Sequence, residues 1–251
     1  IDGDGYLDIV SASYNDDTIA WYENDGAANP TFTAANIATT ADGALGVTIA
    51  DIDGDGDLDI ISASAEDDTI AWYENDGASN PSWTAADIAT SADGAHEVHV
   101  ADLDGDGDID LIGTNDMGYA LRINDGMEWD LTSFMSQIDL YNSTIADFDN
   151  DGVLDLMTPV PGFSDGNSQT VEGNISVRNI NATNVSGVSV IDLSPWSIPT
   201  SLITMDMDGD GVLEQVVAAG EGTLGVFIGG YHTITLDADG DGTLEMSRSG
   251  Y

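Results

Sequence analysis

Carboxylates recur along this chain at a fixed spacing that could hold a hard cation. Residues 51–59 carry Asp at positions 1, 3, 5, 7 and 9 of a nine-residue segment, with Gly at positions 4 and 6. The same plan recurs at residues 102–110, 147–155, 206–214 and 237–245, and residues 1–8 carry it without its first acid. Counted at the second acid of each copy, the segments lie 51, 51, 45, 59 and 31 residues apart, so the chain is built from repeated units.

Oxygen atoms in this pattern match the ligands of Ca²⁺. Side-chain oxygens at positions 1, 3, 5 and 9, a backbone carbonyl at position 7 and a Gly at position 6 suit an ion that takes about 6 to 8 oxygens in a flexible geometry. Mg²⁺ demands a tighter octahedron. An EF-hand would need Glu at position 12, where this chain has Ser62 and Gly113. The segments therefore predict strand-turn-strand calcium loops.

The alternative is a set of solvated Asp-Gly turns without metal. Two bare carboxylates about 4 Å apart repel by about 4 kcal/mol at an effective dielectric near 20, so repeated clusters without a counter-ion are costly. We therefore expect about five to six calcium sites. The predicted ligands, with position 7 contributing its carbonyl in the full copies, are Asp2, Asp4 and Asp8; Asp51, Asp53, Asp55, Asp57 and Asp59; Asp102, Asp104, Asp106, Asp108 and Asp110; Asp147, Asp149, Asp151, Val153 and Asp155; Asp206, Asp208, Asp210, Val212 and Glu214; Asp237, Asp239, Asp241, Thr243 and Glu245.

Between the acidic segments the chain reads as short β-strands. Residues 16–26 and 67–77 are identical, and the second unit predicts strands over 47–50, 58–64, 69–74 and 82–89, separated by turn signals. No stretch keeps a 3.6-residue apolar period, so little helix is expected. Four strands repeated at this spacing favour an all-β protein, a β-propeller of four-stranded antiparallel blades with each acidic loop between the first two strands.

The units are incomplete at both ends of the sequence. We predict one repeat domain, residues 1–251, with units at 1–46, 47–97, 98–143, 144–200, 201–230 and 231–251. The first unit lacks the strand before its acidic segment, unit 201–230 has no obvious fourth strand, and the last unit has only 231–236 and 244–247. Five to six blade units are therefore expected, and closure of a ring within one chain stays open.

An apolar strand followed by Asp-x-Asp-Gly-Asp-Gly-x-x-Asp resembles the FG-GAP or VCBS repeats of integrin-type β-propellers. The resemblance covers nearly the whole chain. It implies calcium in the loop joining the first two strands of each blade, a secreted or cell-surface location, and a role in adhesion, scaffolding or carbohydrate binding.

The composition excludes several classes of partner. The chain has 47 acidic residues against 3 basic ones, a formal charge of -44, so nucleic acid and anionic membrane surfaces are excluded as partners. It has no apolar run of about 18 residues, so no membrane insertion is expected, and no basic-then-apolar leader opens it. There is no Cys and hence no disulfide. In an extracellular setting the sequons at Asn142, Asn174, Asn181 and Asn184 predict N-glycosylation.

These observations favour an extracellular, non-enzymatic, calcium-binding structural or adhesive module, with Ca²⁺ as its folding cofactor. One hypothesis is that the incomplete units leave strand edges for copies of the same chain, building a surface filament; another is that the chain is a piece of a longer protein. Cell-surface proteins or glycans are the other expected partners.

The alternative function is a carbohydrate-binding, lectin-like propeller or an accessory domain of a secreted polysaccharide-active protein. Trp21, Tyr22, Trp72 and Tyr73 could offer a sugar platform, although packing between blades is the expected role of this strand. An enzyme is not favoured, because no nucleophile-base pair is evident. His96 and His99, three residues apart on a predicted strand, face opposite ways, and no catalytic residue is predicted.

Overall fold

Strands are the regular elements of the described part of the chain. The structure, a computed structural model, describes residues 1–115, 118–124, 129–136, 143–147, 153–160, 174–181, 184–192, 199–205, 214–219, 223–228 and 232–235. No helix occurs within these ranges, and hence none that is long and apolar enough to cross a membrane. The predicted all-β class is confirmed.

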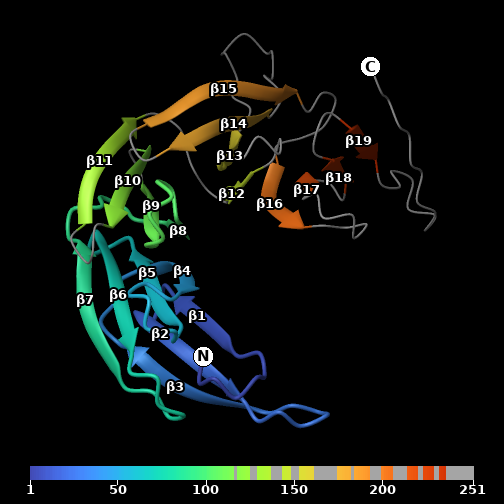
Figure 1. The fold of residues 1–251 in the computed structure, drawn as a ribbon. Helices are drawn as coiled ribbons and strands as arrows, with labels where there is room; N and C mark the ends of the chain where they lie inside the picture. The colour runs from blue at the N-terminus through green and yellow to red at the C-terminus, as the bar shows by residue number, and fades with distance from the viewer. Residues whose placement is uncertain are drawn as a thin grey trace. The chain divides into compact units, whose positions relative to one another are not determined.

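The described strands form five antiparallel sheets, each from strands that are consecutive in the chain (Figure 1). The first sheet holds β1 (Ile9–Ser13), β2 (Thr18–Asn24) and β3 (Phe32–Ala38); the second holds β4 (Ala44–Ala50), β5 (Asp59–Ser64), β6 (Thr69–Asn75) and β7 (Trp83–Ala89); the third holds β8 (Glu97–Ala101), β9 (Asp110–Asn115), β10 (Gly118–Asn124) and β11 (Trp129–Ser136). The fourth holds β12 (Thr144–Ala146), β13 (Asp155–Val160), β14 (Asn174–Asn181) and β15 (Asn184–Asp192), and the fifth holds β16 (Pro199–Met205), β17 (Glu214–Ala219), β18 (Thr223–Ile228) and β19 (His232–Thr235).

The second sheet matches its sequence prediction strand by strand. Strands β4 to β7 lie at the four predicted stretches, and β-branched and aromatic residues fill β6, as such a half-buried surface requires. The tight turn between β5 and β6 places Asp68 at φ +58°, a left-handed conformation that Asp tolerates better than most residues. Asp17 takes the same conformation, φ +55°, between β1 and β2. Identical sequences have folded into the same turn.

The first sheet agrees with its sequence prediction, and the fifth sheet does not. The first sheet has three strands, as predicted from the missing strand before residues 1–8. The predicted division after residue 230 is wrong, because β19 pairs with β18 as the fourth strand of the fifth sheet, from Gly225 opposite Thr235 to Ile228 opposite His232. Residues 231–236 were predicted to open a new unit because an acidic segment follows them, and that segment lies outside the described residues.

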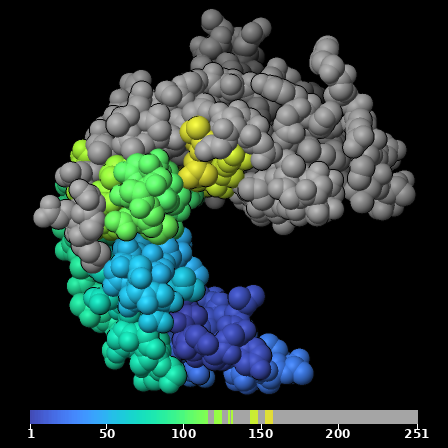
Figure 2. Space-filling view, in the orientation of Figure 1, coloured from blue at the N-terminus to red at the C-terminus, as the bar shows by residue number. Residues whose placement is uncertain are grey.

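The described strands fall into two compact units, residues 1–137 and 138–251, which are described separately. The second unit contains the fourth and fifth sheets, with β12 and β13 in contact with β16. The first unit contains the first three sheets, stacked in chain order (Figures 1 and 2). A single repeat domain over residues 1–251 stays a prediction.

Strand β5 is buried on both faces, and so forms the centre of the first unit. On one face Ile60 clusters with Ala71 and Tyr73 of β6 and with Ile19 of the first sheet. On the other face Ile61 clusters with Ile70, Trp72 and Leu111, the last of these from the third sheet. Because successive strand residues point to opposite faces, one strand supplies both inter-sheet cores.

We expect Ile61→Ala to lower the free energy of unfolding by about 2–5 kcal/mol, since it leaves a cavity in a fully buried core. Urea unfolding in the presence of Ca²⁺ measures this. Leu45→Ala, at a β4 position that is 44% exposed, serves as the control and should change stability by only about 0.5 kcal/mol. Equal losses in the two variants would contradict the two-sided burial of β5.

Candidate metal-binding loops

The acidic segments join the first two strands of their sheets. Residues 51–58 connect β4 to β5, residues 102–109 connect β8 to β9, and residues 1–8 lead into β1. Because the strand order is the same in the second and third sheets, these two loops leave from equivalent ends of their sheets. Residues 51–58 and 102–109 therefore lie between the first two strands of their sheets, as predicted, whereas residues 1–8 lead into the first strand of theirs.

Three carboxylates converge in each complete described loop. One oxygen from each of Asp51, Asp53 and Asp55 lies within 4.8 Å of the others, and Asp102, Asp104 and Asp106 form an equivalent group. Backbone N–H groups within the loop fix these side chains: those of Gly56, Asp55 and Asp57 donate to Asp51 Oδ2 (3.1 Å), Asp53 Oδ1 (3.2 Å) and Asp55 Oδ1 (2.9 Å). These bonds turn the three carboxylates toward one another.

The other two described loops repeat these bonds. Gly107, Asp106 and Asp108 donate to Asp102 Oδ2 (3.2 Å), Asp104 Oδ1 (3.1 Å) and Asp106 Oδ1 (2.9 Å). In residues 1–8 the N–H groups of Asp4 and Tyr6 donate to Asp2 Oδ1 (3.2 Å) and Asp4 Oδ1 (2.8 Å). The shared geometry follows from the shared spacing.

The loop glycines are required by backbone conformation and not by space. Gly54 and Gly56 have φ of +74° and +100°, and a Cβ on either would meet no atom within 4 Å. A residue with a side chain is strained at these angles, whereas Gly adopts them freely. The two glycines therefore let the chain turn back so that the three carboxylates face one point.

One oxygen in the second-sheet loop is buried without a partner. Asp51 Oδ1 is shielded from solvent and accepts no hydrogen bond, and none of the ion pairs found among the described residues involves the Asp51, Asp53 or Asp55 carboxylates. Leaving a charged oxygen buried and unpaired is costly. A hard cation held by these three acids would satisfy it, so the residues present fit Ca²⁺ on their own chemistry.

The ninth-position acid is placed differently from the first three. Asp59 is 1% exposed, and its two oxygens accept the N–H groups of Ile52 (3.1 Å) and Asn75 (2.8 Å). Asp110 accepts those of Leu103 (2.7 Å) and Asn124 (2.9 Å) in the same way. Neither acid belongs to the three-carboxylate groups. Each oxygen keeps a second lone pair, so the geometry assigns position 9 a structural bond and leaves its predicted ligand role a prediction.

Burial makes the ninth-position charge expensive. It raises the pKa of Asp59 above the ordinary value, against the hydrogen bonds from Asn75 and Ile52, which favour the ionised form. The indole of Trp72, whose Nε1 makes no close hydrogen bond, adds a weaker lowering of this pKa. Burial raises the pKa of Asp110 as well. A cation beside either carboxylate would offset this cost.

Comparison with models of protein families identifies the family to which the chain belongs. A model of the FG-GAP-like repeat matches residues 1–62, 51–113 and 102–158, and each match begins in one acidic segment and ends just beyond the next. The chain belongs to the FG-GAP-like repeat family. The comparison with curated protein sequences gave no match.

Solved structures add little to this FG-GAP-like assignment. Of the 46 solved chains that match, one is a lectin of Agrocybe aegerita solved for its recognition of non-reducing terminal N-acetylglucosamine. It shares 16% identity and a TM-score of 0.46, with 96% of this chain and 79% of that chain covered. A likeness at that level carries no argument about this chain's ligand.

A repeated asparagine supports the acidic loops before β1, β5 and β9, and the sequence analysis missed this role. The amides of Asn24, Asn75 and Asn124 donate to the position-8 carbonyls of Leu7 (2.8 Å), Leu58 (3.0 Å) and Ile109 (3.3 Å). The signal was the Asn-Asp-Gly sequence shared by the three units, which the sequence alone explains as a turn. The side chain of its Asn in fact reaches back to the acidic loop.

The remaining predicted site residues fall in three groups. Asp155 is 2% exposed at the start of β13, Asp147 is half-buried and Val153 is exposed. Glu214 opens β17, and the sequons at Asn174, Asn181 and Asn184 lie at the ends of β14 and β15. Outside the described residues lie Asp149, Asp151, Asp206, Asp208, Asp210, Val212, Asp237, Asp239, Asp241, Thr243, Glu245 and Asn142.

The aromatic residues of β2 and β6 pack in the core. Trp21, Trp72 and Tyr73 are 3%, 6% and 5% exposed, which confirms packing over a sugar platform for these three. Tyr22 is half-exposed. The two Trp side chains are thus not available to a glycan.

In the loop before β5, Asp53 at position 3 is exposed and Asp59 at position 9 is buried, so the two should contribute differently to stability in Ca²⁺-free buffer. Asp59→Ala should lower the free energy of unfolding by about 3 kcal/mol, because two buried N–H groups lose their acceptor. Asp53→Ala, in the exposed part of the same loop, should change it by about 0.5 kcal/mol or less. Urea unfolding in EDTA measures both. A loss for Asp53→Ala as large as that for Asp59→Ala would contradict the assignment.

Proposed function

We propose that this FG-GAP-like repeat chain is an extracellular, non-enzymatic β-propeller module whose blades are made rigid by Ca²⁺ and which serves a structural or adhesive role. The observation that carries the proposal is the group of Asp51, Asp53 and Asp55 around the buried, unpartnered Asp51 Oδ1. The equivalent group at Asp102, Asp104 and Asp106 supports it. The metal ligands are the side chains of these residues with the carbonyls of Asp57 and Asp108.

Calcium would act on stability and not on a reaction. Bound Ca²⁺ supplies positive charge that neutralises the repulsion among the three acids. The loop residues then hold the end of β4 to the start of β5, and the end of β8 to the start of β9. A ligand that binds the folded state alone stabilises it by mass action, by about 2.7 kcal/mol per site at 100 times the dissociation constant. Extracellular modules commonly bind Ca²⁺ with dissociation constants of about 10⁻⁴ to 10⁻³ M, which suits a secreted protein.

A binding role is favoured over catalysis by what surrounds the acids. In the described residues the converging groups consist of carboxylates alone, and His99 Nε2 on β8 is 3.6 Å from Glu97 Oε2 and belongs to neither group. The alternative of a carbohydrate-binding propeller loses its Trp platform, because Trp21 and Trp72 are buried. Glycan binding and the four predicted glycosylation sites stay predictions.

Removing calcium should lower the melting temperature. When EDTA empties two or more loops, the free energy of unfolding should fall by several kcal/mol from its value in saturating Ca²⁺. Each site contributes about 2.7 kcal/mol at 100 times the dissociation constant. Differential scanning calorimetry in Ca²⁺ and then in EDTA measures it. In a variant carrying Asp53→Ala and Asp104→Ala, the part of the melting-temperature difference between Ca²⁺ and EDTA that comes from these two loops should largely disappear. An unchanged melting temperature in EDTA would overturn the calcium role.

We extend the proposal to self-association through the unpaired edge of β1. This strand is the edge of the first sheet, and a groove of about 380 Å³ beside it is lined by residues that include Leu7, Val10, Val47 and Leu58. Leu7 and Ile9 are 88% and 49% exposed. In the second and third sheets the corresponding edge is paired by β4 and β8, and a strand from another copy would pair with β1 in the same way.

Analytical ultracentrifugation with Ca²⁺ tests this extension. The chain should sediment as oligomers as its concentration rises, and the double change Leu7→Lys and Ile9→Lys should shift it toward monomer, because charge on an edge blocks strand addition. Leu131→Lys, on the exposed part of β11 and outside the groove, is the control. A chain that stays monomeric at high concentration would contradict self-association.

A further inference from the structure

One apolar core contains residues from two neighbouring acidic loops. Ile52, at position 2 of the loop before β5, is 3% exposed and clusters with Val98 and Leu111 of the third sheet. Ile109, at position 8 of the loop before β9, is partly buried and packs against the same cluster. Each of these loops carries a converging group of three carboxylates. The core between the second and third sheets therefore links two candidate calcium loops.

The strands that lead into the two loops meet at this core as well. β4 is in contact with β8. Ala50, the last residue of β4, and Val100, near the end of β8, both pack against the core. Each loop therefore starts beside the core and places one of its own residues against it.

Ile52 lies between two predicted calcium ligands. Asp51 and Asp53 flank it in the chain and belong to the three-carboxylate group. Its N–H donates to Oδ2 of the buried Asp59 (3.1 Å), so its backbone is bonded to the start of β5. A cation that holds the carboxylates of Asp51 and Asp53 at one point would restrict the peptide between them, and with it the side chain of Ile52.

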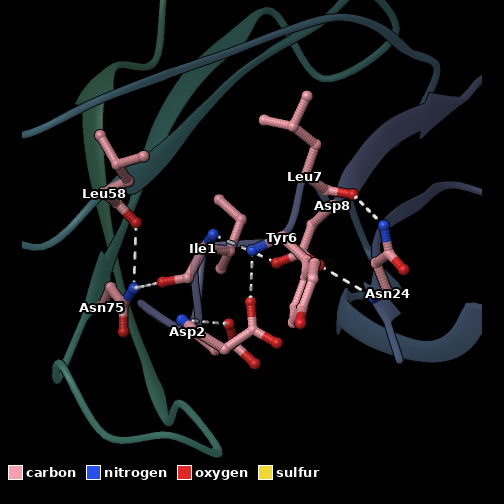
Figure 3. A network of polar contacts seen from close by, with 9 residues as sticks. Ile1, Asp2, Tyr6, Leu7, Asp8, Asn24, Leu58 and Asn75 are labelled. Carbon is pink, nitrogen blue, oxygen red and sulfur yellow. Dashed lines mark hydrogen bonds and ion pairs between the residues drawn. The ribbon is translucent and has the colours of Figure 1, made fainter. Parts of the chain in front are cut away.

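Ile109 is held in a corresponding way in the next loop. It follows Asp108, whose carbonyl is a predicted ligand. Its own carbonyl accepts the Asn124 amide (3.3 Å), just as Leu58 accepts the Asn75 amide in the second sheet (3.0 Å; Figure 3). A cation in the loop before β9 would therefore restrict the residue that this loop contributes to the core.

We infer that Ile52 is a positioning residue that couples calcium binding in the loops before β5 and β9, so that filling one loop raises the affinity of the other. The inference rests on the proposed calcium function. A filled loop holds its side chain in the core, and the neighbouring loop then packs against an ordered surface, so the second cation has less conformational freedom to remove. By linkage the effect is reciprocal. Coupling through packed side chains should change the affinity about twofold to tenfold.

Leu103 provides a matched control within the same chain. It holds position 2 of the loop before β9, and its N–H donates to Asp110 Oδ2 (2.7 Å), as that of Ile52 does to Asp59. Leu103 is 9% exposed, but it is not among the described residues that form the core between the second and third sheets. Leu103→Ala thus shortens the equivalent apolar residue and leaves the members of that core in place.

The experiment is a Ca²⁺ titration of the full ¹⁵N-labelled chain followed by NMR at two reporter amides. Asp57 N–H donates to Asp55 Oδ1 and reports the loop before β5, and Asp108 N–H donates to Asp106 Oδ1 and reports the loop before β9. The loop before β5 is disabled by Asp53→Ala with Asp55→Ala, and Ca²⁺ binding is then measured at the Asp108 amide.

We expect the disabled loop to weaken Ca²⁺ binding at the Asp108 amide about twofold to tenfold, both in the otherwise wild-type chain and with Leu103→Ala. With Ile52→Ala this difference should vanish. Each background is compared with the same background carrying an intact loop. Disabling the loop removes two carboxylates and one bound Ca²⁺ together, so its formal charge equals that of the filled loop, and the comparison reports packing and not charge.

The outcomes separate this inference from the function beneath it. A loss that persists in full with Ile52→Ala overturns the coupling role of this residue. Equal affinities at the Asp108 amide with the other loop intact and disabled also overturn it, while leaving calcium binding intact. A chain in which neither amide responds to Ca²⁺ fails at the proposed function itself. If Ile52→Ala does not fold, Ile52→Val takes its place and should reduce the coupling, and an unreduced coupling overturns the inference.

Discussion

In the two complete described loops, the buried carboxylate at the ninth position, Asp59 or Asp110, bonds the loop to its sheet, and the local structure depends on this interaction. Asp59 receives one N–H from its own loop and one from the end of β6, so a single side chain closes the loop onto the sheet. Both donors would otherwise be buried without a partner. The turn glycines and the converging acids lie in the loop that Asp59 closes, and the supporting asparagine, Asn75, lies at the strand end to which Asp59 is bonded.

The Asp59 carboxylate adds negative charge to a loop that already holds three other acids. Burial raises the pKa of Asp59, and the three acids of the same loop have no basic partner among the described ion pairs. A chain with 3 basic residues against 47 acids has few internal means of compensation. Under the proposed calcium function, external cations supply the compensating positive charge, and the stability of the fold then depends on the ionic content of its surroundings.

Sequence alone predicted the features that repetition makes visible. The acidic loops, the four strands of the second unit and the three-stranded first sheet follow from spacing and turn signals, and the buried Trp21 and Trp72 follow from strand alternation. What it missed depends on contacts far apart in the chain. Asn75 reads as a turn residue until the fold brings it to Leu58 and Ile1, and the pairing of β19 with β18 is a choice between neighbours that a local pattern does not encode.

The two-sided burial of β5 bears on how such a chain can lengthen. The second sheet presents one apolar face to the first sheet and a different one to the third. A tandem duplication of such a unit inserts a sheet that carries both of the faces against which its neighbours pack. The identical stretches 16–26 and 67–77 show the result: Tyr73 is 5% exposed between two sheets, whereas the same residue at position 22 is half-exposed where residues 1–137 place no sheet before it. Copying such a unit therefore needs no new side chains at the faces between neighbouring sheets.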